Sequence, residues 1–491
     1  MNQHEIRPMV ATTMESDTPS IDIEDSQTGS FLYVIVFTAA VGGFLFGYDT
    51  ACISSILMFL DGHETLQPDD SQKGVITGIT SIGSLIGSLV AAFLSDKFGR
   101  KPILFVCCLV FVVSSVQLAA SNSIDWLIKG RLIVGLSVGA ASMVVPVYIS
   151  EIAPQRRRGQ LITINSISTT GGQLIANLIA YKIQGLSNAL NWRLMFIFSG
   201  VPPLLVLALI RIIPESPRYL MLNNEYDKAR ESLTTIFPNS SAFQIEAKIH
   251  MLSKDIARIQ RAKQEHSKKM IGKPAIRALA IGIMLMVYQQ ATGFNSFMYY
   301  GATIFKDLGM SDPLLISIGI SGVNFIFTFV ALKYIDTWGR RRMLLITTFL
   351  MTLSLFASSL TFQRDKDELA VWLILGFVAC YASALGTVPW LSVEFLPLEI
   401  RSIGGSLISS TGWLTNFVVS VTYLQLMDYI HMSGTCLVFG LICAVGWVAV
   451  YQYYPEVNGL SLEEIRNIFQ DGVNLNYGSF VVSDQDSRIG Q

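Results

Sequence analysis

One acidic and one basic side chain stand inside stretches of the chain that are otherwise apolar. Asp49 follows Gly47-Tyr48 in one apolar run, and Arg131 follows Gly130 near the start of another. A charge at the centre of a membrane-embedded helix costs roughly 2.5–3.5 kcal/mol, so each charge needs a reason. The two residues could form a static ion pair that orients their helices. We favour a proton site, in which protonation of Asp49 releases Arg131 and its charge state biases the equilibrium between outward- and inward-facing states. An acid beside a fixed cation keeps a low pKa until the cation moves away, and movement during transport would supply that change.

Amide side chains form a second group inside apolar runs. An amide offers two donor hydrogens and two acceptor lone pairs, which suits a ligand with many hydroxyl groups. An apolar cavity with several amides and an aromatic platform is a common design for sugar-like solutes. Hydrogen bonding between helices is the alternative for any single amide, but the set favours a ligand site. Its members are Gln173, Gln289, Gln290 and Asn295, and the same kind of run also holds Asn324, Trp390, Trp413 and Asn416.

A third group of charged residues lies at the ends of apolar runs, where charge is inexpensive. Its members are Asp96, Arg100, Glu151, Arg157, Asp336, Arg340, Glu394 and Arg401. Their repeated placement predicts a salt-bridge network between helices on the inner face. We assign this network to gating, in which it holds the outward-facing state closed on the inside. The alternative is that these residues only anchor the helix ends.

The chain contains an internal repeat with an offset of about 240 residues. Asp96-Lys-Phe-Gly-Arg-Lys recurs as Asp336-Thr-Trp-Gly-Arg-Arg, Glu151-Ile-Ala-Pro as Glu394-Phe-Leu-Pro, and Pro214-Glu as Pro455-Glu. Three pairs at one common offset indicate two homologous halves in parallel orientation. Such halves usually face each other across a central site and rock to give alternating access.

The elements that carry these residues are long apolar segments. Of the 491 residues, 51% are apolar and 14% charged, and several runs reach the ~20 residues that cross a ~30 Å hydrocarbon layer. Twelve spans are expected, at 31–58, 73–95, 102–120, 125–149, 160–184, 192–213, 275–305, 313–335, 343–362, 370–395, 402–427 and 431–454. We therefore predict an all-α membrane protein with twelve transmembrane helices in two pseudo-symmetric six-helix bundles.

The remaining segments complete the predicted organisation. We expect a disordered tail at 1–30, bundles at 31–213 and 274–455, a linker of short amphipathic helices at 214–273 and a tail at 456–491. The polar, acidic first tail resembles neither a signal peptide nor a mitochondrial presequence. Basic residues concentrate in the linker and in the loops on its side, which the positive-inside rule assigns to the cytoplasm. With an even number of spans, both termini are expected there too.

Other chemistries are not indicated. The net charge is −1, which favours no nucleic-acid partner. The six cysteines (Cys52, Cys107, Cys108, Cys380, Cys436 and Cys443) lie in or beside apolar runs and are interpreted as small apolar residues rather than a redox or metal site. The five histidines form no cluster with metal-ligand spacing, and no HExxH, GxSxG or phosphate-loop motif occurs. We predict no catalytic residues, no metal and no cofactor other than a coupling proton.

With these residues in view, the chain resembles the sugar-porter branch of the major facilitator superfamily over roughly residues 31–470. The motifs are Gly47-Tyr-Asp-Thr50, Asp96–Lys101, Gly130-Arg131, Tyr148-Ile-Ser-Glu-Ile-Ala-Pro154, Pro214-Glu-Ser-Pro-Arg218, Gln289-Gln-Ala-Thr-Gly-Phe-Asn295, Gly386-Thr-Val-Pro-Trp390 and Gly459-Leu-Ser-Leu-Glu-Glu464. Within the branch it is most similar to fungal proton-coupled myo-inositol transporters, through the segments 164–173, 293–299, 321–328 and 462–472.

The resemblance implies roles for individual residues. It implies that Asp49 is the proton-coupling acid with Arg131 as its partner, and it adds Asn324 and Trp390 to the ligand residues Gln173, Gln289, Gln290 and Asn295. The chain departs from many relatives at Gly412, where they carry an amide just before the tryptophan. One ligand hydrogen bond is therefore expected to be missing.

The leading hypothesis is a multi-pass plasma-membrane protein, active as a monomer in the lipid bilayer, that imports myo-inositol or a similar polyol by proton symport. A hexose carrier, either a uniporter or a proton symporter, is the main alternative. A nutrient sensor that binds its ligand without transporting it is the other. We favour the sensor less, because relatives that act as sensors typically carry long cytoplasmic tails, whereas only about 35 residues follow the last expected span.

Overall fold

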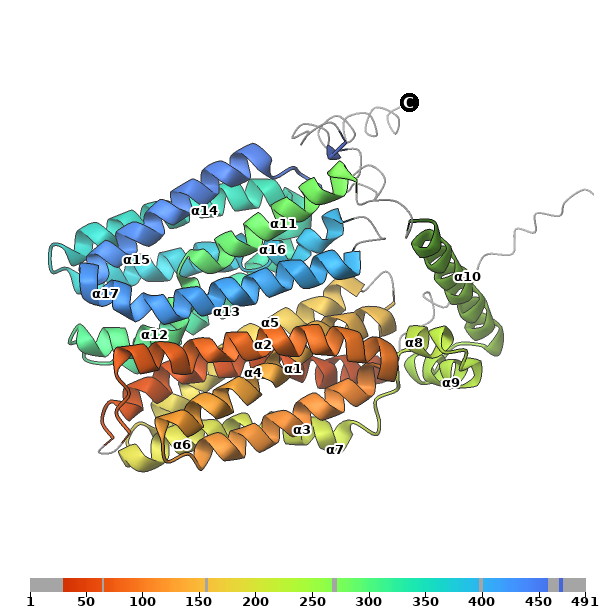
Figure 1. Cartoon of the computed structure of the whole chain (residues 1–491), viewed down its shortest axis with the longest axis horizontal. Coiled ribbons are helices and arrows are strands. Elements are labelled where there is room, and N and C mark those ends of the chain that lie inside the picture. The colour runs from red at the N-terminus through yellow and green to blue at the C-terminus, as the bar shows by residue number, and fades with distance from the viewer. Residues whose placement is uncertain are drawn as a thin grey trace, which may run out of the picture.

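The computed structural model describes residues 30–63, 66–154, 158–266, 272–396, 401–457 and 468–470. Within these ranges the secondary structure is helical, with no strand. Figure 1 shows the helices of the N-terminal half, in red to yellow, lying beside those of the C-terminal half, in green to blue. The helices α8 to α10 extend beyond one end of both halves (Figure 1). We call that end the linker end and the opposite end the distal end.

Seven helices build the N-terminal half: α1 (Ser30–Leu60), α2 (Asp70–Phe98), α3 (Arg100–Ala119), α4 (Ile124–Ile152), α5 (Arg158–Ile183), α6 (Asn188–Ser199) and α7 (Val201–Leu209). Local sequence sets their starts. Asp69 and Gln72 form a reciprocal capping box, with the Asp69 carboxylate accepting from the Gln72 backbone N–H at 2.7 Å. The Ser123 hydroxyl caps α4 in the same way by accepting from the N–H of Trp126.

The linker consists of α8 (Pro217–Leu222), α9 (Tyr226–Ile236) and α10 (Ala242–His266). The C-terminal half follows with α11 (Lys273–Ala291), α12 (Phe294–Asp307), α13 (Pro313–Trp338), α14 (Arg340–Phe362), α15 (Asp367–Cys380), the π-helical turn η3 (Tyr381–Leu385), α16 (Val388–Leu391), the 3₁₀ turn η4 (Ser392–Phe395) and α17 (Arg401–Tyr453). Gly293, with a φ of 82°, separates α11 from α12 and breaks one membrane pass beside the predicted ligand amides.

The described helices account for twelve membrane passes. Ten are long and apolar enough to cross a membrane by length and composition. One of these, α17, contains two passes, because the backbone of His431 is non-helical and the chain reverses there. The remaining pass is α5, whose many hydroxyl and amide side chains lower its hydropathy. α5 packs along α1 and α13, so its polar residues meet protein rather than lipid.

The two halves meet closely toward the distal end. The Ser54 hydroxyl on α1 accepts a hydrogen bond from the backbone N–H of Ala302 on α12, at 2.9 Å. α2 approaches α17 so closely that a Cβ at Gly78 would lie 2.9 Å from a Val421 methyl and 3.2 Å from the Phe417 ring. Glycine permits this approach, and the distal end is therefore closed in this conformation.

Charged residues reinforce the distal closure. The Lys73 ammonium lies 3.0 Å from the Asp61 carboxylate and 3.1 Å from that of Asp70. Asp61 in turn lies 4.0 Å from Lys306 of the other half. The Lys73 side chain is 11% exposed, so water screens it less than it screens an ordinary surface lysine.

Replacing Lys73 should therefore destabilise the fold measurably. We expect Lys73→Met to lower the free energy of unfolding by about 1–3 kcal/mol, because Asp61 and Asp70 lose their charged donor. The measurement is the thermal unfolding midpoint of the purified protein in detergent. Lys228→Met is the matched control, since Lys228 on α9 forms an exposed ion pair with Glu225 and such pairs contribute little. Equal midpoints for the two variants would contradict the prediction.

Candidate functional site

The buried ion pair of Asp49 and Arg131 lies at the centre of the N-terminal half. Asp49 on α1 is 5% exposed and Arg131 on α4 is 1% exposed, and their carboxylate and guanidinium groups are in direct contact. The Arg131 Nε also donates to the Ile76 carbonyl oxygen on α2, at 3.4 Å. The structure thus brings together the two residues that the sequence suggested as a pair, and it ties both to a third helix.

A small cavity adjoins this ion pair and reaches the C-terminal half. Its lining includes Asp49, Arg131, Ser81, Tyr299 and Trp413. It has room for about one water molecule, so this conformation is occluded at its centre. The cavity places the charged pair next to polar and aromatic groups of both halves.

The amides of α11 and α12 form one connected chain. The Gln290 Oε1 accepts from Asn295 Nδ2 at 2.6 Å and from Asn416 Nδ2 at 2.9 Å. Gln290 Nε2 points to Gln289 Oε1 at 3.4 Å. Gln289 Nε2 donates to the Leu385 and Gly386 carbonyl oxygens, which the π-helical turn η3 leaves accessible. Three of the predicted ligand residues therefore lie within one hydrogen-bonded group.

The two other predicted amides meet across the halves. Asn324 Nδ2 on α13 donates to Gln173 Oε1 on α5 at 2.6 Å, and both residues are buried. One turn farther along α5, Asn177 Nδ2 donates to the Ser317 carbonyl oxygen and the Ser321 hydroxyl of α13. In this conformation Gln173 and Asn324 bond to each other between helices, as the interhelical interpretation predicts, and their binding of a ligand stays a prediction.

The lining of the central cavity includes Trp413 but not Trp390, the tryptophan that the resemblance implied as a ligand residue, and that role of Trp390 stays a prediction. Trp390 on α16 is 39% exposed, whereas Trp413 on α17 is 6% exposed and lines the central cavity. The Trp413 ring packs edge-on against Phe46 of α1. Its indole Nε1 has no hydrogen-bond partner in the described part of the chain. The sequence signal for Trp413 was its place between Gly412 and Asn416 in an apolar run.

The space at Gly412 is filled from α11. A Cβ at Gly412 would lie 2.8 Å from Met286 Cγ and 2.9 Å from its sulfur. Met286 lies one helical turn before Gln290, and Gly412 one turn before Asn416, so the methionine packs beside the amide contact. Where many relatives are expected to carry an amide, this chain presents a thioether.

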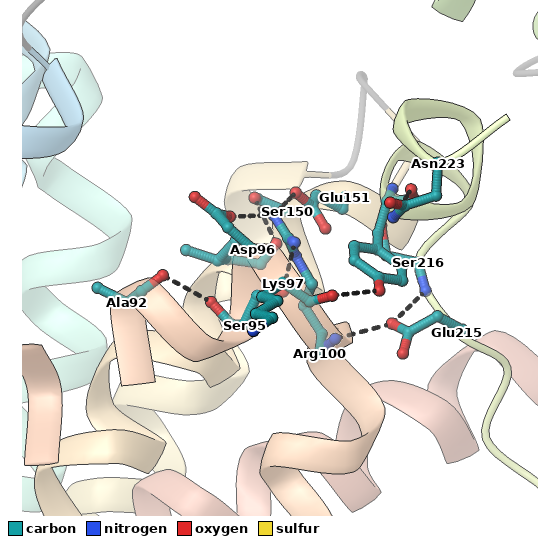
Figure 2. Close-up of polar contacts among 12 residues, drawn as sticks. Ala92, Ser95, Asp96, Lys97, Arg100, Ser150, Glu151, Glu215, Ser216 and Asn223 are labelled. Carbon is teal, nitrogen blue, oxygen red and sulfur yellow. Dashed lines mark hydrogen bonds and ion pairs between the residues drawn. The ribbon is translucent and has the colours of Figure 1, made fainter. Parts of the chain in front are cut away.

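At the linker end, Arg100 joins α3 to the ends of α2 and α4 (Figure 2). Its guanidinium lies 2.9 Å from the buried Glu151 carboxylate and 3.3 Å from that of Asp96. All three residues belong to the N-terminal half. The sequence predicted these residues as part of a network but did not pair Arg100 with Glu151.

Glu215 extends this network, and the sequence analysis did not select it. Its carboxylate accepts from the backbone N–H groups of Arg100 and Ser216, at 3.0 and 2.8 Å (Figure 2). It also accepts from the backbone N–H of Lys101, at 3.1 Å. Burial raises the pKa of Glu215 above its usual value, and these N–H groups and the Arg100 charge partly oppose that rise. The signal for Glu215 was the repeated Pro-Glu pair.

The C-terminal half contains the equivalent arrangement. The Glu456 carboxylate accepts from the backbone N–H groups of Arg340 and Arg341, at 3.2 and 2.9 Å. Gly99 and Gly339, with φ of 100° and 85°, form the corresponding turns before α3 and α14. The other predicted gate residues cannot be compared, because Arg157 lies outside the described residues and the side chains of Asp336, Glu394 and Arg401 are not described.

Comparison with known proteins agrees with this architecture. The sequence profile of the family described as "Sugar (and other) transporter" matches residues 35–469. A probable metabolite transport protein of Saccharomyces cerevisiae is 37% identical over 511 aligned residues, covering 90% of this chain and 92% of that protein. Myo-inositol transporter 1 of Cryptococcus neoformans var. grubii is 36% identical over 491 aligned residues, covering 95% and 86%.

Solved structures are similar as well. The structure of the proton:xylose symporter XylE, a major facilitator superfamily protein, bound to 6-bromo-6-deoxy-D-glucose aligns with a TM-score of 0.76 and 27% identity, covering 90% of this chain and 99% of that one. The inward-open conformation of the xylose transporter XylE from E. coli aligns with the same TM-score at 26% identity. The twelve-helix fold predicted from the sequence is confirmed.

The contact between Met286 and Gly412 generates a double-mutant prediction. Gly412→Asn should destabilise the protein by about 1–3 kcal/mol, because the new side chain collides with Met286. Met286→Ala should restore part of that loss, so the double variant should be more stable than the sum of the single effects implies. The thermal midpoints of the three variants and the parent test this coupling. Strict additivity would contradict it.

The role of Glu215 as a backbone acceptor generates a second prediction. Glu215→Ala should cost about 1–3 kcal/mol, because partly buried N–H groups of α3 lose their acceptor. Glu215→Gln should cost less, since its amide oxygen can still accept from them. Glu456→Ala and Glu456→Gln should show the same order in the other half. Equal thermal midpoints for Ala and Gln at either position would argue against this role.

Proposed function

The chain belongs to the sugar transporter family within the major facilitator superfamily, and we propose that it imports a polyhydroxylated solute, with myo-inositol as the first candidate, in symport with a proton. It is an integral membrane protein of a family of transporters rather than enzymes. We place it in the plasma membrane as a monomer, with the linker end and both termini in the cytoplasm. The distal end then faces outward, and no cofactor other than the proton is needed.

Proton coupling is supported by the buried contact between Asp49 and Arg131. A carboxylate and a guanidinium enclosed by helices are not solvated by bulk water, so each depends on the other for its stabilisation. Protonation of Asp49 neutralises the carboxyl and removes its attraction for Arg131. Because Arg131 also donates to the Ile76 carbonyl oxygen, its release would loosen the contact between α4 and α2. The proton would thereby favour movement of these helices.

Recognition of a polyol is supported by the hydrogen-bonded amides. Asn324 now donates to Gln173, and Asn416 donates to Gln290. A ligand hydroxyl both donates and accepts, so it can replace such contacts one for one without leaving a buried polar group unsatisfied. A ring with a hydroxyl on most carbons would satisfy several amides from both halves at once. Several relatives of this chain are named myo-inositol transporters, which makes that cyclitol the first candidate.

The test is uptake of labelled myo-inositol by cells that lack their own carrier, with and without an inward proton gradient. A proton moving through 100 mV releases ~2.3 kcal/mol, enough for roughly 50-fold accumulation of a solute. We expect the parent protein to accumulate myo-inositol and Asp49→Asn to lose accumulation while it retains downhill exchange. Asp125→Asn, an exposed acid at the start of α4, is the control and should behave like the parent.

Three results would each contradict one part of the proposal. Uptake that is indifferent to the proton gradient and to Asp49→Asn would exclude proton coupling. Uptake of labelled inositol that glucose or xylose suppresses more strongly than inositol itself would identify a hexose or pentose carrier instead. Absence of any inositol uptake by a protein that reaches the cell surface would remove the substrate assignment.

A further inference from the structure

Asn416 links the predicted ligand amides to the opposite half of the protein. It lies on α17 and is buried. Its Nδ2 donates to Gln290 Oε1 at 2.9 Å, while its Oδ1 accepts from the Ser81 hydroxyl of α2 at 2.7 Å. A continuous path of two hydrogen bonds therefore runs from the N-terminal half, through Asn416, to Gln290.

The acceptor capacity of Gln290 is fully used in this arrangement. An amide oxygen has two lone pairs, and those of Gln290 accept from Asn295 and Asn416. A substrate hydroxyl that donates to this oxygen must first displace one of the two. Asn416 and the substrate therefore compete for the same atom.

The hydrogen bonds that position the Asn416 side chain depend partly on where α2 lies. Tyr299 and Ser420 also donate to the Asn416 Oδ1, at 3.2 and 3.4 Å, but both belong to the C-terminal half and can stay with it. Ser81 makes the shortest of these contacts and comes from the other half. Opening the distal end requires α2 to leave α17, because Gly78 lies against Phe417 and Val421. That movement breaks the contact between Ser81 and Asn416.

We propose that Asn416 is a positioning residue that makes the ligand affinity of Gln290 depend on the distal closure, with Ser81 as its trigger. With the distal end closed, the hydrogen bond from Ser81 holds Asn416 in the position in which its Nδ2 donates to the Gln290 oxygen. With the distal end open, Asn416 is released and the Gln290 oxygen becomes available to a substrate hydroxyl. The affinity for substrate is then higher while the distal end is open, which is the side from which the proposed function imports it. The affinity falls when the distal end closes.

The same helix also meets the proton pair. Ile76, one and a half turns before Ser81 on α2, accepts from Arg131, and Ser81 lines the cavity that contains Asp49. Displacement of α2 therefore changes the surroundings of the ion pair and of Gln290 together. This gives the positioning role a direct mechanical connection to the proposed coupling site.

The test compares Ser81→Ala with Ser88→Ala, a matched serine whose hydroxyl donates within α2 to the Leu85 carbonyl oxygen. Loss of one hydrogen bond present only in the distal-closed state should shift the population toward the distal-open state by about fivefold. For labelled substrate added outside, Ser81→Ala should lower KM by up to about fivefold and lower Vmax for net uptake. Exchange with internal substrate should be reduced less than net uptake. Ser81→Thr, which keeps the hydroxyl, should restore the parent values.

The outcomes separate this inference from the proposed function on which it rests. If the parent protein transports no inositol, the substrate assignment fails, and the same comparison is made with the sugar that it does transport. If the parent transports substrate and Ser81→Ala matches Ser88→Ala in both KM and Vmax, the inference is wrong. A lower Vmax with unchanged KM, unrelieved by Ser81→Thr, would indicate a merely structural role and would overturn it too.

Discussion

The structure depends on one constraint: a polar group left unpaired between membrane-crossing helices costs free energy, because neither lipid nor bulk water is available to it. The Asp49 carboxylate binds Arg131. Asn324 donates to Gln173, Asn416 donates to Gln290, and Gln289 donates to the Leu385 carbonyl oxygen. These partners come from different helices. Satisfying the buried polar groups therefore fixes how the helices pack and where the two halves meet.

The same constraint makes the contacts exchangeable. A hydrogen bond such as that between Asn324 and Gln173, or Asn416 and Gln290, has little net value when a hydroxyl group can take the place of either partner. The halves can therefore separate at these points if a polyol or water replaces the lost contacts. An apolar interface of the same shape would offer no comparable replacement. The amides thus serve both as contacts between helices and as the proposed recognition groups.

The duplicated sequence produces symmetry in one region and asymmetry in another. At the linker end, Glu215 and Glu456 accept from the first backbone N–H groups of α3 and α14, after glycines of the same unusual conformation. At the centre the halves differ, since the ion pair belongs to the N-terminal half and the Gln290 chain to the C-terminal half. The first backbone N–H groups of a helix need an acceptor in both halves, so this feature is repeated. The central regions contain different polar groups, an ion pair in one half and amides in the other.

The sequence by itself determined the twelve spans, the repeat and the residue types at the centre, because hydropathy, spacing and the cost of buried charge are properties of local segments. It predicted that Asp49 and Arg131 would meet, although they lie on different helices. Only the tertiary structure decided that Glu151 binds Arg100, that Trp413 lines the cavity, and that Met286 fills the space at Gly412. It also decided that Ser81 reaches Asn416. Which helix faces touch depends on the packing of many segments. The residues in these contacts lie far apart in the chain, so no local sequence pattern predicts them.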